Sequence, residues 1–111
     1  MYTTAQDVAA SYNRMLLNIY SGENSEYASL EDYLEGLAIN PEYVQQRKYV
    51  RGRLVEQYDT GISFVLSGGG PTVWLNTADG MLYASDNGNC AGVGLFSEVR
   101  DEINDIFGIE Y

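Results

Sequence analysis

Residues 62–85 constrain the fold most, because strand-forming segments and turn-forming residues alternate there. Three segments of strand length are rich in β-branched and aromatic residues, namely 62–67, 72–76 and 81–85. Three glycines and a proline at residues 68–71 interrupt the first two segments, and an Asp-Gly pair within residues 77–80 interrupts the last two. We therefore expect three consecutive antiparallel strands that form a floor on which helices pack.

Two helices are predicted before these strands. Residues 4–20 carry apolar side chains at helical spacing, and Thr4 with Asp7 three residues later is placed to form a capping box. Ser29 is suited to cap a short second helix, which we expect to end near Ala38.

The segment that follows the second helix is harder to assign. Pro41 is suited to the first turn of a third helix, and the apolar residues after it are loosely spaced. Gly52 weakens a continuous helix, and residues 53–58 fit either its last turns or an edge strand. We favour a helix to about Arg51, followed by a strand.

The end of the chain is predicted to return to the sheet and finish in a helix. Residues 86–94 contain several glycines without a period, and we expect a loop there. Ser97 is suited to cap a last helix, with Gly108 just beyond its C-terminus. The fold class expected for residues 1–111 is a single α+β domain, in which N-terminal helices and a C-terminal helix pack on a small antiparallel sheet of three to four strands.

The charge of the chain limits the partners that it can bind. Its 111 residues include 16 acidic and 6 basic side chains and no histidine, which gives a formal net charge of −10. Such a surface repels nucleic acid, anionic membranes and phosphate metabolites, whereas it attracts basic partners and speeds their encounter. We therefore expect a basic protein surface as the partner, without direct binding to nucleic acid or membrane.

Cysteine content and hydropathy favour a cytoplasmic protein. Cys90 is the lone cysteine, so it cannot form an intramolecular disulfide, and we expect it to be a small buried side chain. Residues 1–20 lack the basic and apolar regions of a secretory signal. No apolar run approaches the roughly 20 residues that span a bilayer.

Two glycine-containing motifs resemble nucleotide-binding loops but lack essential parts. Residues 68–70 are three glycines, yet Pro71 and a strand follow where a phosphate-binding loop needs a lysine and a helix. The pattern Gly92-x-Gly94-x-x-Ser97 has a serine in place of the third glycine of a dinucleotide fingerprint, and no βαβ unit surrounds it. Turn formation is the expected role of both.

Residue types also exclude several catalytic centres. Because the chain has no histidine and one cysteine, it cannot form a zinc site of the usual kind, a Cys-His pair or a Ser-His-Asp triad. Residues 86–89 have the composition of a calcium loop without the ligand spacing of an EF-hand, which leaves a solvated turn or a weak cation site. Paired carboxylates for acid–base chemistry would need an apolar cleft. We expect a protein that is not an enzyme and has no cofactor or metal.

The acidic residues are regularly spaced on the last predicted helix. They recur at i, i+3, i+4 and i+7, so they share one face, and they are Glu98, Asp101, Glu102 and Asp105. Like charges at these spacings destabilise a helix by about 0.2–0.5 kcal/mol per pair, and Arg100 lies off the row. A second acidic set falls on the second predicted helix and consists of Glu31, Asp32 and Glu35.

Two interpretations of these acidic residues remain open from the sequence. They are either an ordinary solvated helix surface, or carboxylates presented where a partner expects phosphates. The second interpretation has a physical basis, because carboxylates one helical turn apart, about 5.4 Å, form a linear array comparable to the charges along a DNA backbone. Under that interpretation the seven residues bind the partner.

Basic and aromatic residues add two further expectations. The basic residues of the middle segment either form a small positive patch or pair with the acidic helices, which we favour, and they are Arg47, Lys48, Arg51 and Arg53. Ten tyrosines exceed what one core needs, so some are expected at an interface, with Tyr20, Tyr27, Tyr43, Tyr49, Tyr58 and Tyr111 as candidates.

One segment resembles proteins of mobile genetic elements. The segment from Phe64 to Val73, which contains Leu66-Ser67-Gly68-Gly69-Gly70-Pro71, resembles an L-S-x-G-G-P stretch of small phage and mobile-element proteins. The small, acidic, histidine-free chain is also similar in profile to anti-CRISPR and antirestriction proteins, many of which block nucleic-acid-binding surfaces. This resemblance implies an inhibitor that acts as a DNA mimic on a host defence complex in the bacterial cytoplasm. The alternatives are an immunity protein that neutralises a basic nuclease toxin and a structural or interaction domain.

Overall fold

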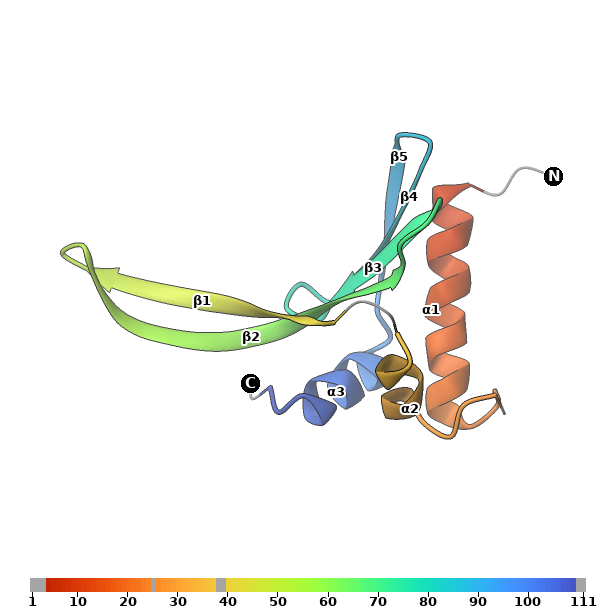
Figure 1. Cartoon of the computed structure of the whole chain (residues 1–111), viewed down its shortest axis with the longest axis horizontal. Coiled ribbons are helices and arrows are strands. Elements are labelled where there is room, and N and C mark those ends of the chain that lie inside the picture. Colours follow the sequence, from red (N-terminus) through yellow and green to blue (C-terminus); the bar gives the residue numbers. More distant parts are fainter. Residues whose placement is uncertain (1–3, 25, 38–39, 110–111) are drawn as a thin grey trace.

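The computed structural model describes residues 4–24, 26–37 and 40–109, which form three helices and one five-stranded antiparallel sheet. The expected α+β class is therefore confirmed, with five strands rather than three to four. The strands are neighbours in sequence order, from β1 to β5, and the helices lie on one side of the sheet (Figure 1). The elements are α1 (Ala5–Ser21), α2 (Leu30–Glu35), β1 (Glu42–Val50), β2 (Arg53–Ser67), β3 (Thr72–Asn76), β4 (Met81–Asp86), β5 (Asn89–Gly94) and α3 (Ser97–Ile106).

Helix α1 begins and ends as the sequence predicts. The Thr4 side chain accepts a hydrogen bond from Asp7 N, and the Asp7 side chain accepts one from Thr4 N, which together form the capping box. Gly22 ends the helix at a φ of 83°. The helix packs on β4 and β5, and buried Asn13 donates a hydrogen bond of 3.0 Å to the Gly94 carbonyl.

Strands β2, β3 and β4 form the predicted floor of the core. Alternate residues of these strands point to the helices and are buried, which is the period-2 pattern of a half-covered antiparallel sheet. They are Ile62, Phe64 and Leu66 on β2, Val73 and Leu75 on β3, and Leu82 and Ala84 on β4. The two breaks predicted from sequence are the turns between these strands.

The prediction of a loop at residues 86–94 is wrong, because residues 89–94 form strand β5. Asn87 and Gly88 have φ of 50° and 83°, as in a two-residue hairpin turn, and β5 then pairs with β4. Gly92 lowers the strand propensity of this segment, yet it fits because the Tyr83 ring lies over it. A Cβ at Gly92 would be 3.0 Å from Tyr83 Cδ1.

The prediction of a third helix up to about Arg51 is also wrong. The segment is strand β1, which pairs with the 15-residue strand β2, whereas the strand favoured after Arg51 is present as the first part of β2. Arg51 and Gly52, with φ of 51° and 78°, form the two-residue turn of this hairpin. The glycine that weakens a helix is therefore the residue that allows the turn.

Helices α2 and α3 differ slightly from prediction at their ends. Ser29 caps α2, which ends at Glu35, and the predicted end at Ala38 lies outside the described residues. Ser97 is the first residue of α3 rather than its cap, and Phe96 occupies the cap position without a side-chain hydrogen bond. The α3 C-terminus ends as expected at Gly108, whose φ is 70°, and two backbone hydrogen bonds close the turn, Gly108 N to Asp105 O and Ile109 N to Asn104 O.

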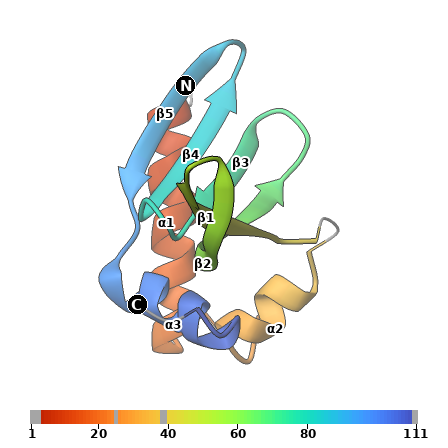
Figure 2. The ribbon, with the colours of Figure 1, turned by 90° about the vertical axis from the view of Figure 1, so that its left-hand side faces the viewer.

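The molecule consists of a compact body and a projecting hairpin, and its extents are 55 × 34 × 24 Å (Figures 1 and 2). We call the outer part of the β1–β2 hairpin, residues 45–59, the arm. Every arm residue is exposed, and the arm projects from the body by about 20 Å if each residue adds about 3.4 Å.

Candidate protein-binding face

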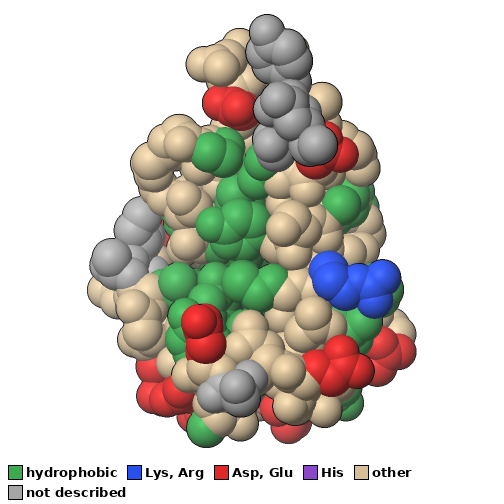
Figure 3. Space-filling view, turned by 90° about the vertical axis from the view of Figure 1, so that its right-hand side faces the viewer, with side chains coloured by type: hydrophobic (Ala, Val, Ile, Leu, Met, Phe, Trp, Pro, Cys, Tyr) green, Lys and Arg blue, Asp and Glu red, His purple; other side chains and the backbone are tan. Residues whose placement is uncertain are grey.

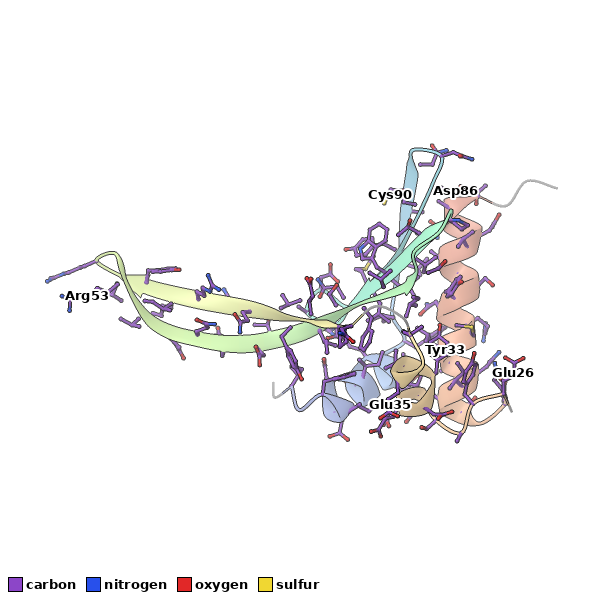
Figure 4. All side chains as sticks on the ribbon, viewed as in Figure 1. Glu26, Tyr33, Glu35, Arg53, Asp86 and Cys90 are labelled. Carbon is purple, nitrogen blue, oxygen red and sulfur yellow. The ribbon has the colours of Figure 1, made fainter. Side chains whose placement is uncertain are left out.

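The seven acidic residues singled out in the sequence lie on two helices that contact each other. Helices α2 and α3 pack side by side at one end of the body (Figure 2). Glu35 is at this end, on the side away from the sheet (Figure 4). We call the surface formed by these carboxylates the acidic face, and it comprises Glu31, Asp32, Glu35, Glu98, Asp101, Glu102 and Asp105. The view onto the α1 side also shows acidic side chains lining this lower end (Figure 3).

On α2 the acidic side chains are exposed, and one of them also supports the helix. Glu31 and Asp32 lie in the first turn, where negative charge is favourable near the positive end of the helix dipole. The Asp32 side chain accepts a hydrogen bond of 3.4 Å from Ala28 N, while Asp32 N donates one of 3.1 Å to the Ser29 hydroxyl. Glu31 and Glu35 are therefore the better candidates for contact with a partner.

On α3 three of the four acidic residues are exposed. Glu98, Asp101 and Asp105 are exposed, whereas Glu102 is half-buried and contributes less to the surface. The Ser97 hydroxyl donates a hydrogen bond of 3.1 Å to Glu98 Oε1. Asp105 lies in the last turn of the helix.

Arg100 lies among the acidic residues of α3 in the sequence, but its side chain bonds to another part of the molecule, as expected. Arg100 Nε donates a hydrogen bond of 2.8 Å to the Thr77 carbonyl, and its terminal nitrogen donates one of 3.2 Å to the Ala78 carbonyl. Arg100 thus fastens α3 to the turn between β3 and β4.

An apolar cavity opens beside the acidic face. It has a volume of about 160 Å³ and lies between α2, the segment before β1, β2 and the end of α3. Apolar side chains dominate its lining, with Glu35 and Asn40 as polar neighbours, and the apolar set is Leu34, Leu37, Pro41, Phe64 and Phe107. A partner side chain with an apolar stem and a basic head group would be complementary to this arrangement.

The basic residues of the middle segment are not on the body, which corrects the pairing favoured from sequence. Arg47, Lys48, Arg51 and Arg53 all lie on the arm, and Arg53 is near its tip, at the opposite end of the molecule from Glu35 (Figure 4). With Glu56 and Asp59 also present, the arm carries four basic and two acidic side chains, or +2. The rest of the chain, with two basic and fourteen acidic side chains, carries −12.

The arm also carries most of the large hydrophobic side chains that the described part of the chain exposes. Five of the seven lie there, namely Tyr49, Val50, Leu54, Val55 and Tyr58, with exposed fractions from 48% to 57%. Tyr43 at its base is also exposed, and its hydroxyl donates a hydrogen bond of 3.3 Å to the Phe107 carbonyl. Tyr43, Tyr49 and Tyr58 were among the tyrosines expected at an interface, whereas the projecting hairpin that carries Tyr49 and Tyr58 was not expected. The Arg51-Gly52 pair between two strand-like segments is the signal that identifies it.

Other residues considered in the sequence analysis have structural roles or different surroundings. Cys90 is exposed, not buried as expected, because it lies near the β4–β5 turn (Figure 4). Tyr20 is exposed, Tyr27 is half-buried against the Tyr33 ring, and Tyr111 lies outside the described residues. Asp79 accepts a hydrogen bond of 2.6 Å from the Tyr83 hydroxyl, and this bond raises the pKa of Tyr83.

Comparisons of the chain with protein-family models, curated proteins and solved structures gave no match. None of the helices described here is long and apolar enough to cross a membrane. The two features of the described surface that suggest a binding role are the acidic face with its adjacent cavity and the basic, hydrophobic arm.

Proposed function

We propose that the protein is a non-enzymatic inhibitor of the phage or mobile-element type. Its acidic face would occupy a basic, nucleic-acid-binding site on a host defence complex. The observation that supports this proposal is the contact between α2 and α3, which brings the helices that carry the two acidic sets together at one end of the body. The exposed carboxylates of two helices then give this end of the body more negative charge than either helix would alone.

The physical basis of the inhibition is competition for the same cations. A site that binds nucleic acid places lysine and arginine along a line of phosphates, and its affinity comes largely from the release of counterions. Carboxylates about 5.4 Å apart along α3 offer such a site an alternative line of negative charge. The net charge of −10 also speeds encounter with a basic surface.

The cavity beside Glu35 adds an element that charge alone lacks. An arginine or lysine of the partner can bury its methylene groups against Leu34 and Phe107 while its head group meets Glu35. Apolar burial in a pocket surrounded by polar contacts is the usual composition of an interface hot spot. We place the complex in the bacterial cytoplasm, where an exposed thiol such as Cys90 stays reduced.

The proposal is tested by reversing charges on the acidic face. Glu35→Lys and Asp105→Lys are suitable because each residue lies in the last turn of its helix, where a cation is favourable near the helix dipole. Asp86→Lys is the matched control, since it makes the same charge change beside the β4–β5 turn (Figure 4). Each tagged protein is used to capture partners from bacterial lysate at low and high ionic strength, and duplex DNA is then added as competitor.

The expected result is a nucleic-acid-binding protein that the wild type and Asp86→Lys retain at low salt and that DNA displaces. Glu35→Lys and Asp105→Lys should slow its association by roughly tenfold and weaken its salt dependence. Equal association rates for all four proteins would reject the acidic face as the binding surface.

A further inference from the structure

Within the residues that the structure describes, the arm is a two-stranded hairpin that packs on no other element. All of residues 45–59 are exposed, and an isolated hairpin of two strands is only marginally stable in water. It nevertheless carries five exposed large hydrophobic side chains. Hydrophobic groups concentrated on an unsupported projection indicate a surface that is covered in an assembly.

The charge of the arm shows which surface is complementary to it. The arm carries +2 and the remainder of the same chain carries −12. Arg53, near the tip of the arm, lies at the opposite end of the molecule from Glu35 of its own chain (Figure 4). In a second copy of the protein, the acidic face is free to approach the arm of the first copy.

We propose that the arm of one copy docks on the acidic face of a second copy. This inference builds on the proposed role of the acidic face as a docking surface for basic groups, and it assigns that face an additional occupant. Self-association then competes with binding of the basic partner, because both use the same carboxylates.

The two surfaces match in chemistry as well as in net charge. Arg47 and Tyr49 lie on the same side of β1, and Leu54 faces Tyr49 across the hairpin. Tyr49 or Leu54 can enter the apolar cavity beside the acidic face of the other copy while Arg47, on the same side of the hairpin, meets Glu35. Arg53 lies beside the turn on the opposite side and adds to the positive charge of the arm near its tip. Aromatic and arginine side chains are the residues that most often dominate interface energies.

Two other binding partners for the arm are electrostatically less favourable than the acidic face. Pairing of two arms edge to edge brings together surfaces of like charge, and Lys48 on the edge strand β1 opposes such pairing. Duplex DNA would attract the arm but would also meet a body with a charge of −12, which repels it. The acidic face has the charge opposite to that of the arm.

A two-fold arrangement closes the assembly. If each arm lies on the body of the other copy, two identical contacts form and no docking surface is left over to bind further copies. A one-sided contact would instead leave a free arm and a free acidic face and so produce filaments. We therefore expect a dimer.

The test is a charge exchange measured by sedimentation velocity on the full chain in a Cys90→Ser background, which excludes disulfide-linked dimers. The arm variant is Arg47→Glu with Arg53→Glu, and the face variant is Glu35→Lys with Asp105→Lys. Each variant alone should raise the dimer dissociation constant at least about tenfold, because like charges then meet at both contacts. Mixing the two variants should restore the dimer, since both contacts of the mixed pair join opposite charges.

Three outcomes would overturn the inference. They are a monomeric wild type at low ionic strength, a dimer that neither variant weakens, and a mixture that does not recover. A 20-base-pair DNA duplex is titrated in parallel, and binding by the wild type that the arm variant loses would reassign the arm to nucleic acid.

The same proteins separate this inference from the proposed function. A wild type that stays monomeric but captures a basic partner through Glu35 and Asp105 would reject the dimer and leave the proposed function in place. A dimer that passes the charge exchange while no basic partner is captured would do the reverse. If both hold, the face variant should displace the partner from immobilised wild-type protein, because its arm is intact while its own face no longer binds the partner. A protein that carries both the arm and the face substitutions should not.

Discussion

The Thr77 hydroxyl donates a hydrogen bond of 2.6 Å to Asn104 Oδ1, and both side chains are completely buried. The same hydroxyl oxygen accepts a hydrogen bond of 2.8 Å from Ile62 N. Through these bonds the turn after β3 joins α3 to β2. The position of the α3 carboxylates therefore depends on a polar contact inside the core.

Replacing Thr77 by valine should destabilise the protein by about 2–3 kcal/mol, because Ile62 N and Asn104 Oδ1 each lose a buried partner while the side-chain volume is kept. The free energy of unfolding in urea measures the effect. Thr72→Val is the matched control and should cost less than about 1 kcal/mol, since the hydroxyl of Thr72 bonds Gly69 O at a half-buried site. Equal costs for the two variants would contradict a special role for Thr77.

Gly61→Ala should destabilise the protein by at least about 2–3 kcal/mol. A Cβ at Gly61 would lie 2.7 Å from Ala78 Cα and closer still to Ala78 N, so the backbone of the β3–β4 turn would have to move. Gly69→Ala is the control, because a Cβ there meets no atom within 4 Å. Thermal unfolding of both variants provides the measurement, and a Gly61→Ala protein as stable as Gly69→Ala would show that the turn can shift freely.

Tyr33 should make stability fall at high pH. Burial, with a smaller effect of neighbouring Tyr12 and Tyr27, raises the pKa of Tyr33 from 10.0 to about 12. The folded state thus holds this proton more tightly than the unfolded state, so the stabilisation is complete below pH 10 and is lost as the pH rises through about 12.

The loss attributable to Tyr33 should be roughly 1–2 kcal/mol once partial solvent screening is allowed for. Urea unfolding of the wild type and of Tyr33→Phe between pH 9 and about 12 isolates it, because all other titrating groups are shared. Parallel pH profiles of the two proteins would show that the proton of Tyr33 is not linked to folding.

Removing the arm should leave the body folded. Replacing residues 45–60 by Asn-Gly joins Val44 to Gly61, which already face each other across the hairpin, through a favourable two-residue turn. Since the arm packs only on itself, we expect the free energy of unfolding to change by less than about 1 kcal/mol. Circular dichroism and urea unfolding measure this, and a protein that no longer unfolds cooperatively would show that the arm supports the body.

The parts of the fold that the sequence predicts are those with a clear local period. The capping box at Thr4 and the apolar stripe after it define α1, and the alternation around Phe64 and Leu75 defines the central strands. Strand β1 was not predicted because its apolar residues, Tyr43, Val44, Tyr49 and Val50, fit no period well. Its conformation is decided by pairing with β2.

The candidate site was predictable in part for the same reason. Helical spacing alone places Glu98 and Asp105 on one face, whereas the contact between α2 and α3 depends on the packing of the whole core. The arm was predictable only in part, because residues 53–58 fit either the end of a helix or an edge strand, and neither assignment places them on a projecting hairpin. Their exposure results from the length of β2, which continues beyond the sheet.

Helix α1 rests on the two strands that lie farthest from it along the chain, and Asn13 bonds a carbonyl 81 residues away. During synthesis on the ribosome the first helix therefore emerges long before its binding surface exists. The hairpins, whose strands follow one another directly, can form as they appear. The amphipathic helix must remain exposed, or be shielded by a chaperone, until the last fifth of the chain is made.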